Sequence, residues 1–124
     1  MNPVTRHLLE NIDDPDLAEF AVAWDVLEEQ VVRIYRAAAC PPAEAVAFER
    51  GLQSAAASYP RWAEALAPHW RAASVEAALV KEDPFDRILH TGGAKSVIGN
   101  GPLIRTLPAA REALNHLLLE RAVA

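Results

Sequence analysis

Residues 16–39 have the sequence DLAEFAVAWDVLEEQVVRIYRAAA, and the other elements are expected to pack against this stretch. Its large apolar residues recur three or four positions apart, so they share one face of a helix: Leu17, Phe20, Trp24, Leu27, Val31 and Ile34. No proline or glycine interrupts the stretch, which predicts a single helix of more than about six turns. Because an apolar face of that breadth needs other helices to cover it, the stretch is expected to be the core helix.

Prolines divide the rest of the chain into further helical segments, because a proline is tolerated in the first turn of a helix but removes a hydrogen bond from its interior. Apolar residues at helical spacing follow Pro42, Pro60 and Pro108. These patterns predict three more main helices, at residues 42–59, 61–81 and 107–121. The four main helices are joined by short connections, which favours antiparallel neighbours.

Shorter segments complete the prediction. One short helix is expected at residues 4–12 with Val4, Leu8 and Ile12 facing inward, and another after Asp83, whose side chain can cap the first amides of a helix. The glycine-rich segment 92–105 then precedes the last helix. An Asn-Gly pair at residues 100 and 101 would allow a small hairpin in this segment, and the alternative is an irregular loop.

Composition supports the same fold class. Aromatic residues make up 6% of the 124 residues, whereas alanine, leucine, glutamate and arginine, which favour helix, are abundant. The chain is long enough for one sizeable core without metals or disulfides. We therefore expect an all-α single domain over residues 1–124: an antiparallel bundle of four main helices, two short ones and an irregular glycine-rich loop.

Charge and cysteine content narrow the function classes. The formal net charge is −5, which argues against a nucleic-acid partner because phosphate contacts need a positive face. No segment has the length and apolarity of a membrane span, so no membrane partner is expected. The single cysteine, Cys40, cannot form an intrachain disulfide, which fits the reducing cytoplasm.

A small anion is the ligand that the sequence suggests most directly. Lys95 and Arg105 flank a glycine-containing segment before the last helix, and basic groups beside exposed amides can hold a carboxylate or phosphate. His69 and His90 are added to this candidate site, because histidine titrates in the range that a general base needs. The alternative is a plain connection between helices with two structural histidines. No metal, cofactor or defined catalytic residue is expected.

Val22 and Val26 offer a candidate interface. Both fall on the face of the core helix opposite its apolar stripe, where they would be exposed unless a second copy or a protein partner covers them. The alternative is two incidental surface valines. The leading hypothesis is thus a small non-enzymatic helical binding or assembly module that self-associates. The second is a ligand-binding or catalytic bundle with a small-anion pocket near residues 91–106.

Overall fold

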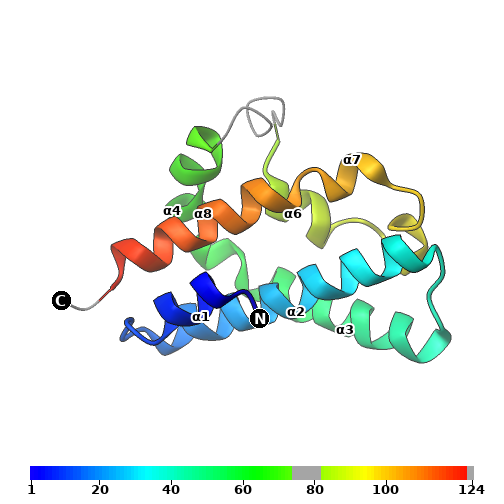
Figure 1. Ribbon diagram of the computed structural model, residues 1–124, viewed down its shortest axis with the longest axis horizontal. Coiled ribbons are helices and arrows are strands. Elements are labelled where there is room, and N and C mark those ends of the chain that lie inside the picture. Colours follow the sequence, from blue (N-terminus) through cyan, green and yellow to red (C-terminus); the bar gives the residue numbers. More distant parts are fainter. Residues whose placement is uncertain (74–81, 123–124) are drawn as a thin grey trace.

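The computed structural model describes residues 1–73 and 82–122, and within these ranges every extended run of regular structure is helical (Figure 1). The all-α class is confirmed. In chain order the elements are α1 (Pro3–Leu9), α2 (Pro15–Ala37), α3 (Pro42–Ser58), α4 (Pro60–Ala72), α6 (Pro84–Leu89), the short 3₁₀ helix η1 (Ala94–Ser96), α7 (Gly101–Ile104) and α8 (Leu107–Glu120).

The core helix α2 forms as the apolar spacing predicts. The Asp14 side chain accepts a hydrogen bond from the Leu17 amide at 3.1 Å, and Pro15 occupies the first turn. The helix ends at Ala38, which has a left-handed conformation with φ of 52°. All six large apolar residues of the predicted stripe are buried.

The main helices pair in a particular way. A short connection folds α3 back along α2, and α8 packs chiefly against α4 and α1. In Figure 1, α2 and α3 run side by side along the molecule, whereas α4 stands across their direction. The expected antiparallel bundle of four main helices is therefore not confirmed. Ala73 is extended, so α4 ends at Ala72 and not at Lys81; residues 74–81 of the predicted helix lie outside the described residues.

One continuous apolar core joins these elements. At its centre, Phe85 of α6 lies with its ring centroid 4.7 Å from that of Trp24 and 5.4 Å from that of Tyr59. The predicted cap of α6 is present, because an Asp83 oxygen accepts a hydrogen bond from the Phe85 amide at 2.9 Å. The other Asp83 oxygen accepts one from the Tyr59 hydroxyl. These contacts fix α6 between α3 and α8.

The glycine-rich segment is irregular apart from two short helical turns, η1 and α7, and it forms no hairpin. Gly92 and Gly93 have φ of 89° and 121°, a conformation open to glycine, and they turn the chain into η1. The possible hairpin is wrong, because residues 101–104 form α7. The Asn100 side chain accepts a hydrogen bond from the Leu103 amide at 3.1 Å, so it caps a helix instead of starting a turn between strands.

The inward face predicted for the first helix is correct at Leu8 and Ile12, which pack against the core, but wrong at Val4 of α1. Val4 was expected to be buried, but 58% of it is exposed, whereas its neighbour Thr5 is fully buried. The Thr5 hydroxyl donates a hydrogen bond to the Asn115 Oδ1 of α8 at 2.8 Å. The buried side of α1 therefore combines a hydrogen bond to a distant helix with the apolar contacts of Leu8 and Leu9.

Candidate functional site

A buried ionic cluster links α1, α2 and α8. The Arg111 side chain, whose residue is only 9% exposed, donates hydrogen bonds to Asp25 Oδ1 and Glu28 Oε2, each at 3.0 Å, and to the Thr5 hydroxyl at 3.1 Å. A second bond joins the Arg111 guanidinium to the same Glu28 oxygen. With Asn115 bound to Thr5, these residues form what we call the Arg111 cluster: Thr5, Asp25, Glu28, Arg111 and Asn115.

Helix geometry explains how the Arg111 cluster assembles. Arg111 lies four residues after Leu107 and three before Leu114, so it belongs to the buried stripe of α8. Asp25 and Glu28 lie three apart on α2 and share the face beside the stripe. This site was not predicted from the sequence, although the arginine within a leucine stripe was a signal: a buried guanidinium requires acidic partners.

The cluster brings two carboxylates to one guanidinium. Burial raises the pKa of Glu28, and this effect outweighs the hydrogen bond and charge of Arg111, which lower the pKa. The nearby charges of Asp25 and Glu29 raise it further. Glu28 therefore keeps its proton to a higher pH than an ordinary glutamate does.

This shift predicts a pH dependence of stability. Because the folded chain holds the Glu28 proton more tightly than the unfolded chain, protonation stabilises the fold below the ordinary pKa of 4.5, and this contribution is lost as the pH rises through the raised pKa. We expect the free energy of unfolding of the wild type to fall relative to that of Glu28→Gln over a pH range that begins near the ordinary pKa of 4.5 and ends above the raised pKa. Urea unfolding of both proteins across that range measures it, and a difference that stays constant would contradict the prediction.

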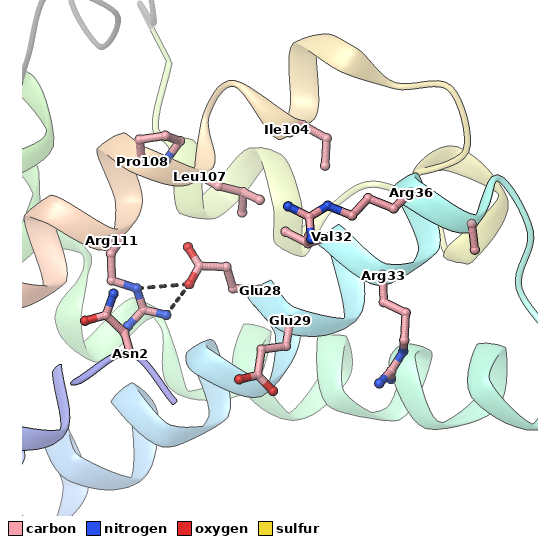
Figure 2. Close-up of a pocket in the computed structure, with 11 residues that line it drawn as sticks. Asn2, Glu28, Glu29, Val32, Arg33, Arg36, Ile104, Leu107, Pro108 and Arg111 are labelled. Carbon is pink, nitrogen blue, oxygen red and sulfur yellow. Dashed lines mark hydrogen bonds and ion pairs between the residues drawn. The ribbon is translucent and has the colours of Figure 1, made fainter. Parts of the chain in front are cut away.

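Next to the Arg111 cluster, a groove of about 810 Å³ opens between α2 and the α7–α8 segment (Figure 2). This volume lies within the usual range for small-molecule sites, about 300–1,000 Å³. Aliphatic side chains supply its apolar lining: Val32 and Ala37 from α2, Ile104 from α7, and Leu107 and Pro108 from α8. The polar residues that line it are Asn2, Glu28, Glu29, Arg33, Arg36 and Arg111.

The structure places the two predicted histidines in other settings. His69 lies on α4, where its Nε2 is 3.0 Å from a Glu120 oxygen and its ring stacks on that of His116, with centroids 5.6 Å apart. His90 ends α6, and its Nδ1 lies 3.0 Å from the Asp86 carbonyl oxygen. Neither histidine lines the groove.

The two predicted basic residues are exposed. Lys95 lies in η1 and Arg105 directly follows α7, and neither lines the groove, although the neighbouring Ile104 does. The segment predicted to hold the ligand, residues 91–106, thus contributes Ile104 to the lining of the groove. Arg36, which sequence analysis did not select, is a basic residue that lines it.

Comparison of the chain with protein-family models, curated proteins and solved structures found no match to any of them. Within the described residues, no helix has both the length and the apolarity needed to cross a membrane. In the same ranges, no three histidine, cysteine, aspartate or glutamate side chains are grouped to hold a metal ion.

Proposed function

We propose that this protein is a small non-enzymatic binding and assembly module of the cytoplasm, and that it self-associates through the outer face of α2. The observation that supports this is the exposure of Val22 and Val26, at 42% and 48%. They lie one turn apart on the same side of the core helix, so a partner would bury both together.

The charges on this face favour a second copy as the partner. Glu19 lies seven residues before Val26 and Arg33 seven residues after it, and both are exposed. If two copies of α2 pack antiparallel with Val26 at the two-fold axis, Glu19 of each copy faces Arg33 of the other. A two-fold interface repeats the contact, so two ion pairs would flank the apolar centre. Arg33 also lies 3.3 Å, from its Nε, from a Glu44 oxygen of its own chain, so the guanidinium would be shared between Glu44 and Glu19 of the second copy.

Solution mass tests the proposal. We expect the wild type to dimerise with rising concentration in light scattering and sedimentation, and Val22→Lys with Val26→Lys to raise the dissociation constant by about tenfold or more, because lysine charges replace buried apolar area. Val46→Lys is the control: it introduces one lysine, half the charge change of the double variant, at a 49% exposed valine on α3 and should leave the dissociation constant unchanged.

A charge exchange tests the antiparallel arrangement. Glu19→Arg should weaken association by opposing two arginines, and combining it with Arg33→Glu should restore it, because each pair is then re-formed with reversed signs. A wild type that stays monomeric at every concentration would refute self-association. Association that the valine variant leaves intact would refute this face as the interface.

A further inference from the structure

The groove between α2 and the α7–α8 segment has an apolar lining suited to an aliphatic group. Val32, Ile104, Leu107 and Pro108 supply that surface, and its lining residues include no aromatic ring. An aliphatic chain could bury its surface there without the stacking partners that a planar aromatic ligand uses. Neither Val22 nor Val26 lines the groove, and of the residues assigned to the proposed interface only Arg33 also borders it.

The charged groups around the groove differ in how far they are already paired. Arg111 is bound by Asp25 and Glu28. Arg33 points out of the groove in Figure 2, and its Nε lies 3.3 Å from a Glu44 oxygen. The Glu29 carboxylate is likewise directed away from the apolar lining in Figure 2. Arg111, Arg33 and Glu29 therefore place little net charge against the apolar lining of the groove.

Arg36 is different. Within the described residues it forms no ion pair, and Figure 2 shows its side chain extended along the groove beside Val32, on the side that faces Ile104. An arginine guanidinium presents a planar set of donors that matches the two oxygens of a carboxylate. A single unpaired guanidinium beside an aliphatic surface complements a ligand with one anionic end and one apolar end.

We propose that this groove binds a small amphipathic carboxylate, an aliphatic chain with one terminal carboxyl group. The chain lies against Val32, Ile104, Leu107 and Pro108, and the carboxylate pairs with Arg36. This site goes beyond the proposed self-association and does not depend on it. The proposal also moves the anion site that was expected from the sequence. The basic residue that pairs with the anion is Arg36 of α2, in place of Lys95 and Arg105.

Calorimetric titration with three probes tests the two parts of the site. Octanoate carries both chain and charge, octan-1-ol has the chain without the charge, and acetate has the charge with almost no chain. We expect octanoate to bind saturably, octan-1-ol to bind about tenfold more weakly or worse, and acetate to show no saturable binding, since a charge-assisted pair contributes at least about a factor of ten. Octan-1-ol binding as tightly as octanoate, or no saturable octanoate binding, would overturn the proposal.

Two arginine variants locate the carboxylate. Arg36→Gln should weaken octanoate binding about tenfold or more and leave octan-1-ol binding unchanged. Arg105→Gln is the matched control, because Arg105 is exposed and adjoins Ile104 without lining the groove. The reverse result, loss with Arg105→Gln and none with Arg36→Gln, would overturn the assignment in favour of the loop.

A third variant tests the groove itself. Val32→Glu places a carboxylate four residues before Arg36, a favourable spacing for an ion pair within a helix, so it should compete with the ligand and abolish octanoate binding. Circular dichroism and thermal unfolding check that each variant is folded, and sedimentation during the titration separates ligand binding from a change in association. Unchanged octanoate binding by folded Val32→Glu would refute the groove as the site.

Discussion

Replacing Arg111 by methionine is expected to lower the free energy of unfolding by about 3–5 kcal/mol. The variant would leave the Asp25 and Glu28 carboxylates without the guanidinium that binds both, and Asp25 is only 4% exposed. It would also remove one hydrogen bond from the buried Thr5 hydroxyl, which positions α1. Removing one partner of a buried ion pair is costly because the other charge stays in a poorly solvated place. Urea unfolding followed by circular dichroism measures the loss.

Two further variants distinguish the cost of leaving buried carboxylates unpaired from the cost of losing any arginine. Arg121→Met removes an arginine that is 43% exposed in its side chain and lies 3.5 Å from an Asp14 oxygen, so it should cost less than about 1 kcal/mol. Combining Arg111→Met with Asp25→Asn and Glu28→Gln removes all three charges and should recover much of the stability. If Arg111→Met costs no more than Arg121→Met, the Arg111 cluster is not a stabilising core feature.

Local rules predicted most of the helices. Apolar spacing gave α2 within two residues of its observed ends, and Pro42, Pro60, Pro84 and Pro108 each lie at the start of a helix. These signals work because spacing and proline chemistry act over a few neighbouring residues. The Asn100 cap of α7 is equally local, and an Asn followed by a Gly-Pro pair was open to a helical interpretation as well as to a hairpin.

The errors come from contacts between distant residues. Thr5 is buried in place of Val4 because it bonds to Asn115 and Arg111, more than 100 residues away in the sequence. A helix as short as α1 has too few apolar residues to fix its own orientation, so such contacts decide it. The same reason explains why the packing of α4 against α8 did not follow from the order of the helices.

The candidate site was only partly accessible from the sequence. Lys95 and Arg105 were selected because they flank the glycine-containing segment that precedes the last helix. The groove instead depends on the packing of α2 against the α7–α8 segment, and this brings Arg36 to the same groove as Ile104, 68 residues further along. No periodicity within one helix carries that information. The outward position of Val22 and Val26 needed only helical geometry and was predicted correctly.

Replacing Phe85 by alanine is expected to lower the free energy of unfolding by about 3–5 kcal/mol, comparable to the effect of Arg111→Met. Phe85 is fully buried, and its ring lies against those of Trp24 and Tyr59. Its helix α6 has only six residues and is too short to persist alone, so it depends on this side chain for its place in the core. The cavity left by the ring would therefore loosen α6 as well as remove apolar contacts.

Chemical unfolding measures the total loss, and amide hydrogen exchange locates it. The amides of α6 should lose protection more than those of α3, because α3 keeps its contacts with α2. Val46→Ala, a truncation at an exposed position of α3, should change the free energy of unfolding by no more than about 0.5 kcal/mol. Protection lost equally in α3 and α6 would show that Phe85 supports the core as a whole, and a loss no larger than that of Val46→Ala would show that the core closes around the missing ring.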